Sequence, residues 1–130
     1  LLFTVYSGTY FLNIPYTADY VLEYGVDDDG TWTLDGTLIL SSGYEPDSST
    51  YTISNLTSGT HQLTVTVENN GPGSDNWEEN PGGIAWTLKP LTGPQAGEII
   101  ASSLDLDTQG DGNLIWHTRL ATGYKYYEIT

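Results

Sequence analysis

The chain has 130 residues, with 17 acidic side chains against 3 basic ones, a net charge of −14 and no cysteine. A field of this sign repels nucleic acid and anionic lipid, so nucleic-acid binding is excluded as a main role. The missing thiols exclude disulfides, zinc–thiolate centres and cysteine nucleophiles. No stretch reaches the ~18 apolar residues of a membrane span.

Short strands separated by turn signals predict an all-β fold, an antiparallel β-sandwich of jelly-roll type. In chain order we expect strands at residues 9–14, 20–26, 31–34, 37–41, 49–54, 61–68, 83–88, 98–104, 113–118 and 124–129. The length predicts a single domain, 1–130, with its core in 8–90 and a C-terminal return hairpin in 97–130. Residues 2–6 already alternate, and we interpret the chain as a processed form or an excerpt from a longer protein.

Hydrophobic alternation assigns the faces of two strands. In 20–26 the tyrosines, leucine and valine at every second position are expected to face the core, with Glu23 in water. In 61–68 the side chains of Leu63, Val65 and Val67 are expected to point inward. Asp35-Gly36 is a strong signal for a tight hairpin turn after the strand at 31–34.

Three adjacent carboxylates follow the strand at 20–26. Asp27, Asp28 and Asp29 repel one another, and a hard cation with oxygen ligands such as Ca²⁺ would neutralise them. Neighbouring strand residues point in opposite directions, so at most two could share one ion on a regular backbone. The alternative is an Asx-rich turn in which these side chains accept hydrogen bonds from backbone amides.

The longest irregular segment is 69–82, and Trp77 lies in its middle. With Asp75, Asn76 and Glu78 it forms a candidate carbohydrate-binding group, because an aromatic face stacks on a pyranose while carboxylates and amides bind its hydroxyls. The alternative is a tryptophan that anchors its own segment or packs against a neighbouring subunit.

No catalytic signature supports an enzyme. The chain has no Gly-x-Ser-x-Gly elbow, P-loop or His-Glu-x-x-His, and we expect His61 and His117 to be structural. A glycan hydrolase would need two carboxylates ~5–10 Å apart in a cleft, which the sequence does not reveal.

The order of several short motifs suggests a family. Residues 8–88 contain Asp28-Asp29-Gly30, Leu34-Asp35-Gly36, Gly59-Thr60-His61 and Ala85-Trp86, and this run resembles the PA14-like and galactose-binding-like jelly-roll modules. That resemblance implies carbohydrate binding and a Ca²⁺ ion held by Asp27 and Asp28, with Asn69 and Asn70 nearby on a second loop.

A second resemblance concerns the C-terminal part. Residues 112–127, with Trp116-His117-Thr118-Arg119, resemble segments of phage virion proteins, especially tail-fibre and appendage proteins of cyanobacterial phages. The two resemblances together imply a non-enzymatic structural and adhesive module of an extracellular or virion assembly, a tail fibre or surface appendage that contacts host glycans. The start of the chain within a strand and its aromatic C-terminal part indicate that neighbouring subunits complete the fold, so we expect a homo-oligomer or contacts with other virion subunits. The alternative is a Ca²⁺-dependent carbohydrate-binding module of a secreted enzyme or adhesin.

Overall fold

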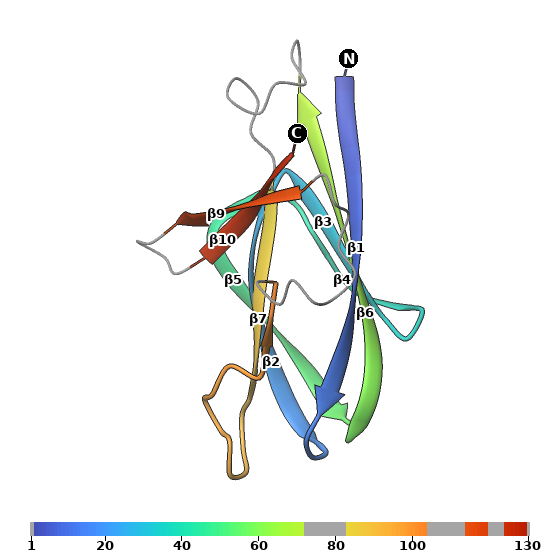
Figure 1. Cartoon of the computed structure of the whole chain (residues 1–130), viewed down its shortest axis with the longest axis vertical. Helices are drawn as coiled ribbons and strands as arrows, with labels where there is room; N and C mark the ends of the chain where they lie inside the picture. Colours follow the sequence, from blue (N-terminus) through green and yellow to red (C-terminus); the bar gives the residue numbers. More distant parts are fainter. Residues whose placement is uncertain (1, 72–82, 104–113, 120–123, 130) are drawn as a thin grey trace.

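The structure, a computed structural model, describes residues 2–71, 83–103, 114–119 and 124–129. The secondary-structure elements found among these residues are all strands, shown in Figure 1: β1 (Leu2–Ile14), β2 (Ala18–Asp27), β3 (Asp29–Leu34), β4 (Thr37–Ser42), β5 (Glu45–Leu56), β6 (Gly59–Gly71), β7 (Gly83–Pro90), β8 (Ala101–Ser102), β9 (Leu114–Arg119) and β10 (Tyr124–Ile129). Within these ranges, no helix has the length and hydropathy needed to cross a membrane.

Two antiparallel sheets of four strands pack against each other. The first sheet has the order β1-β6-β3-β4 and the second the order β5-β2-β7-β8, while β9 and β10 pair only with each other. The predicted antiparallel β-sandwich is therefore confirmed. The jelly-roll assignment of its strand order stays a prediction.

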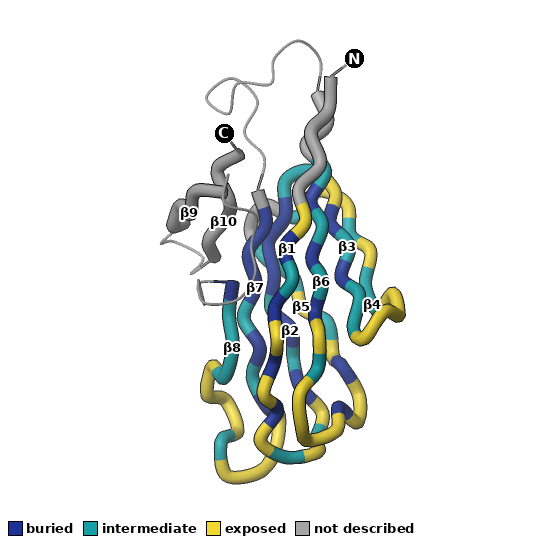
Figure 2. Tube along the Cα trace, turned by 45° about the vertical axis from the view of Figure 1, so that its right-hand side comes forward, coloured by how far each residue is buried: buried dark blue, intermediate teal, exposed yellow. Residues whose placement is uncertain are grey.

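The core lies between the two sheets, and the alternation predicted from the sequence is observed (Figure 2). Its buried hydrophobic members are Tyr10, Leu12, Ile14, Tyr20, Leu22, Tyr24, Val26, Trp32, Ile53, Leu56, Leu63, Val65, Val67, Ile84, Trp86 and Leu88. The Trp86 ring meets the Tyr10 ring edge-on with centroids 5.0 Å apart, and this contact joins β7 to β1 across the sandwich. Alternating apolar side chains thus bury one face of each sheet, which is the main source of stability in a domain of this kind.

Tight connections carry the chain from one sheet to the other. Only Asp28 separates β2 from β3, and only residues 57–58 separate β5 from β6. The hairpin between β3 and β4 turns at Asp35 and Gly36, whose φ angles are 50° and 85°. Positive φ at both central positions is typical of a type I′ turn, which Asp-Gly favours. The predicted hairpin is therefore confirmed.

Two sequence predictions need correction. Of the strand expected at 98–104, the described residues 98–103 form only β8, because backbone turns occupy the residues before it: Gly97 N–H donates to Pro90 O and Glu98 N–H to Gln95 O. Residues 69–71, expected to begin an irregular segment, belong instead to β6, which pairs with β1 as far as Leu2.

Candidate functional site

Acidic residues meet at the end of the sandwich where β2 crosses to β3. Asp28 N–H donates to Glu68 O at 3.3 Å, and Asp29 lies directly opposite Glu68 in the β3–β6 ladder. Directly opposite residues of an antiparallel pair share one face, and two carboxylates in that arrangement repel each other. The crossing therefore places Asp29 and Glu68 together on the outer face of the first sheet.

Hydroxyl side chains cover the next part of that outer face. One row across the sheet is formed by Ser7, Thr66, Thr31 and Ser41, which oppose one another on four adjacent strands. A second row is formed by Thr9, Thr64 and Thr33. We call these seven residues the hydroxyl face. Hydrogen bonds between strands order part of it, since Ser7 Oγ lies 2.8 Å from Thr66 Oγ1 and Thr9 Oγ1 lies 3.5 Å from Thr64 Oγ1.

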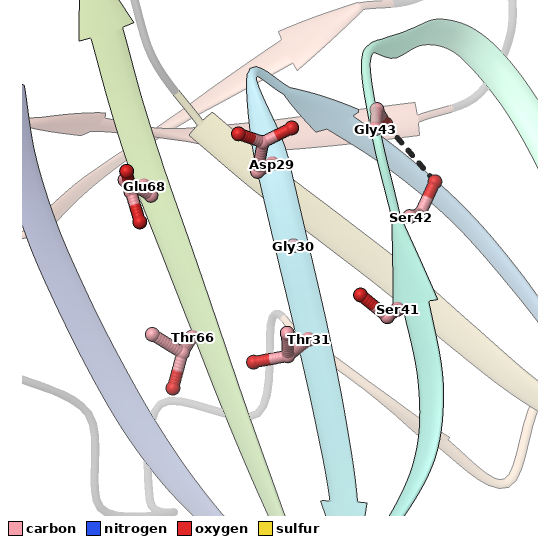
Figure 3. A pocket seen from close by; sticks show the side chains of 8 residues that line it. All are labelled: Asp29, Gly30, Thr31, Ser41, Ser42, Gly43, Thr66 and Glu68. Carbon is pink, nitrogen blue, oxygen red and sulfur yellow. Dashed lines mark hydrogen bonds between the residues drawn. The ribbon is translucent and has the colours of Figure 1, made fainter.

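A hollow of about 260 Å³ joins the carboxylates to the hydroxyl face (Figure 3). Its lining consists of Asp29, Gly30, Thr31, Ser41, Ser42, Gly43, Thr66 and Glu68, from β3, β4, β6 and the residue after β4. The volume is slightly below the ~300–1,000 Å³ that is typical of small-molecule sites. Gly43 lies at the rim beside the carboxylate, since a Cβ at this position would lie 3.8 Å from Asp29 Oδ1, an ordinary contact distance.

The lining determines what the hollow can do chemically. Each serine or threonine hydroxyl can donate one hydrogen bond and accept others, and each carboxylate accepts strong hydrogen bonds from hydroxyl donors. A neutral polyhydroxylated molecule offers many donors and acceptors at short spacing and fits this pattern. An anionic ligand would meet Asp29 and Glu68 and be repelled.

The residues predicted for Ca²⁺ lie near this hollow. Asp27 ends β2 opposite Gly83, and Asp28 is the crossing residue beside Glu68. Asn69 and Asn70 follow Glu68 along β6, opposite Thr4 and Phe3 of β1, so they lie on a strand and not on a second loop as predicted. In the part of the chain that the structure describes, no three acidic or histidine side chains form a group that could hold a metal ion.

The predicted carbohydrate-binding group of Asp75, Asn76, Trp77 and Glu78 lies outside the described residues. The strands on either side of it are described: β6 ends at Gly71 and β7 begins at Gly83. Gly83 pairs with Asp27, so the second of these strands starts at the acidic end of the sandwich. His117 belongs to β9, whose side chains are likewise outside the description.

A second hollow, of about 410 Å³, lies near the other end of β1. It is lined by Asn13, Pro15, Gln95, Glu98, Ile99 and Ile100. Three of these residues are apolar and only one carries a charge, so this hollow lacks the dense array of hydroxyls and carboxylates. It is the weaker candidate for a polyhydroxylated ligand.

His61 has a carboxylate partner that the sequence did not reveal. Its Nδ1 lies 2.6 Å from Asp35 Oδ2 and its Nε2 lies 2.7 Å from Thr57 O. Both partners are acceptors, so the ring satisfies both contacts only as an imidazolium. The bond to Asp35 raises the pKa of His61, and the bond to the Thr57 carbonyl adds to this although partial burial opposes it.

This His61–Asp35 pair joins two connections of the fold. Asp35 Oδ1 also accepts the backbone N–H of Gln62 at 2.8 Å, and this bond, followed by the one to His61, lowers the pKa of Asp35. The Thr57 hydroxyl lies 3.2 Å from Nε2, farther than the carbonyl. Because Nε2 donates to that carbonyl, it is not placed to remove a proton from the hydroxyl. The pair is therefore a clamp that ties the β3–β4 turn to the connection between β5 and β6.

Comparison of the chain with models of protein families, with curated proteins and with solved structures found no match. The resemblance to the PA14-like and galactose-binding-like modules therefore depends on the sequence motifs alone.

Proposed function

We propose that this domain is a non-enzymatic structural and adhesive module of an extracellular or virion assembly, such as a tail fibre or surface appendage, and that its hydroxyl face contacts host glycans. The observation that carries the proposal is the hollow lined by Thr31, Ser41, Thr66 and two carboxylates. Hydroxyls and carboxylates on a rigid sheet can exchange several hydrogen bonds with a saccharide without ordering a mobile segment.

The same lining supports a selective role for neutral glycans. Asp29 and Glu68 would repel sulfated or sialylated chains, and the net charge of −14 acts in the same direction. The lining contains no aromatic ring, so we expect each contact to be weak. Several copies in one assembly would raise the overall affinity through multivalency, which suits an adhesive subunit better than a free receptor.

Loss of two hydroxyls tests this proposal. We expect the Thr31→Val/Thr66→Val variant, displayed on a tetrameric carrier, to bind neutral glycans on an array about tenfold more weakly than the unmodified chain, since each hydrogen bond contributes about 0.5–1.5 kcal/mol. Valine keeps the shape and the strand preference of threonine. Heparin and sialylated glycans should not bind to either protein.

The matched control is Thr50→Val/Thr52→Val, which makes the same changes at exposed positions of β5 on the second sheet. This control should bind as the unmodified chain does. Absence of binding to every neutral glycan at multivalent display, or equal binding by the Thr31→Val/Thr66→Val variant, would contradict the proposed site.

The alternative is a Ca²⁺-dependent carbohydrate-binding module. The observation that favours it is the backbone bond from Asp28 to Glu68, which sets the run Asp27-Asp28-Asp29 next to the backbone of Glu68, the residue before Asn69. Under this alternative, Asp27 and Asp28 hold the ion. Comparison of the melting temperature in Ca²⁺ with that in Mg²⁺ tests it.

A further inference from the structure

Strand β1 is a long edge of the first sheet. It pairs with β6 without a register shift from Leu2 to Ile14, and no other described strand pairs with its second side. In an antiparallel ladder, alternate residues direct their N–H and C=O groups to the partner strand, and the residues between them direct these groups away. The second side of β1 therefore offers a regular row of backbone donors and acceptors.

The other sheet edges carry features that oppose pairing with another chain. β8 has only two residues. β5 begins with Glu45, Pro46 and Asp47 and has two register shifts against β2. β4 has six residues and a register shift against β3. Short length, proline, charge and bulges are the devices by which natural sheets prevent edge-to-edge association.

Strand β1 has none of these devices. Its sequence, LFTVYSGTYFLNI, contains no proline and no charged residue over 13 residues. In a chain with 17 acidic side chains, a strand of this length without one is a distinct feature. On its outer side it carries Phe11, which is 49% exposed.

We propose that β1 pairs with β1 of a second copy of this chain, antiparallel and about a two-fold axis, to form one continuous sheet of eight strands. An antiparallel strand edge is complementary to itself, which a two-fold interface requires. Two copies of net charge −14 repel each other, and β1 is an edge where they can approach without setting carboxylates face to face. This inference is independent of the glycan proposal, although the pairing would set two hydroxyl faces side by side.

Lysines on the outer side of β1 test the pairing. In Ser7→Lys/Thr9→Lys/Phe11→Lys, every antiparallel register with its two-fold axis between residues 7 and 11 brings two lysines directly opposite each other. We expect sedimentation equilibrium at concentrations up to about 100 µM to give a dimer mass for the unmodified chain and a dimer at least about tenfold weaker for this variant, because like charges opposed across strands are destabilising.

The matched control is Thr50→Lys/Thr52→Lys/Ser54→Lys on β5, also an edge strand and also exposed at all three positions. It changes the net charge by the same amount and should dimerise as the unmodified chain does. Thermal unfolding of both variants establishes that they fold.

A second measurement needs no substitution. Amide hydrogen exchange over residues 7–13 should show protection of consecutive amides at high concentration and of alternate amides on dilution, since pairing engages the second side of β1. A monomer mass for the unmodified chain at the highest concentration, equal dimerisation of the β1 variant, or alternate protection at every concentration would overturn the proposal.

Discussion

His61 and Asp35 form the contact in which single ionisable groups most clearly affect this fold. The side chain of His61 is 13% exposed and that of Asp35 is 51% exposed, so solvent screens the pair partly. Folding raises the pKa of His61, so its stabilisation is complete below the ordinary value of 6.5 and is lost as pH rises through the folded value. Folding lowers the pKa of Asp35, so its contribution is present above 3.8 and is lost as pH falls through the folded value.

A double-mutant cycle of His61→Gln and Asp35→Asn therefore has a defined pH dependence. Asparagine tolerates the positive φ of residue 35, so the β3–β4 turn should keep its backbone conformation in Asp35→Asn. We expect a coupling free energy of about 0.5–1 kcal/mol near pH 5.5 and a smaller one at a pH above the raised pKa of His61, measured by urea unfolding. A coupling of the same size at both pH values would show that the imidazolium form is not what the clamp uses.

At the scale of the elements, Gly30 determines how closely β3 approaches β2 and β7 of the second sheet. A Cβ on Gly30 would lie 2.9 Å from Ile84 Cδ1 and 2.9 Å from Val26 Cγ2, closer than side-chain carbons pack. We expect Gly30→Ala to lower the free energy of unfolding by about 1–3 kcal/mol, the usual cost of overpacking a filled core.

Gly43→Ala is the matched control for this substitution. At Gly43 a Cβ meets only Asp29 Oδ1, at 3.8 Å, so the added methyl group should change stability by less than about 1 kcal/mol. Denaturant unfolding of both variants measures the difference. Equal losses for the two variants would mean that strand preference, and not the contact of β3 with the second sheet, explains the effect.

The elements also show where the sequence was informative. Period-two alternation in β2 and β6 predicted the buried faces, and Asp35-Gly36 predicted the hairpin, because both signals are local. The pairing of Asp29 with Glu68, 39 positions later, depends on which strands become neighbours, and alternation within one strand contains no such information. For the same reason the sequence did not predict the hydroxyl face, whose seven members come from four strands. It also did not predict the partner of His61.

At the scale of the whole molecule, the net charge of −14 opposes the compact state by self-repulsion. Added NaCl shortens the range of this repulsion, since the Debye length falls from about 30 Å at 0.01 M to about 10 Å at 0.1 M. We expect the melting temperature to rise by about 2–5 °C over that interval, which corresponds to about 1 kcal/mol in a domain of this size.

Divalent cations separate this general effect from a specific ion site. Screening depends on ionic strength. At matched ionic strength Ca²⁺ and Mg²⁺ should therefore raise the melting temperature equally if Asp27, Asp28 and Asp29 are only part of a charged surface. A Ca²⁺ site adds linkage of about 2.7 kcal/mol at a hundredfold excess over the dissociation constant, several degrees beyond Mg²⁺. Asp28→Asn would abolish that excess, whereas Asp19→Asn, which removes a carboxylate at the far end of β2, would leave it intact. Equal shifts with the two cations would contradict the Ca²⁺-dependent alternative and leave the hydroxyl face as the site to which the glycan proposal applies.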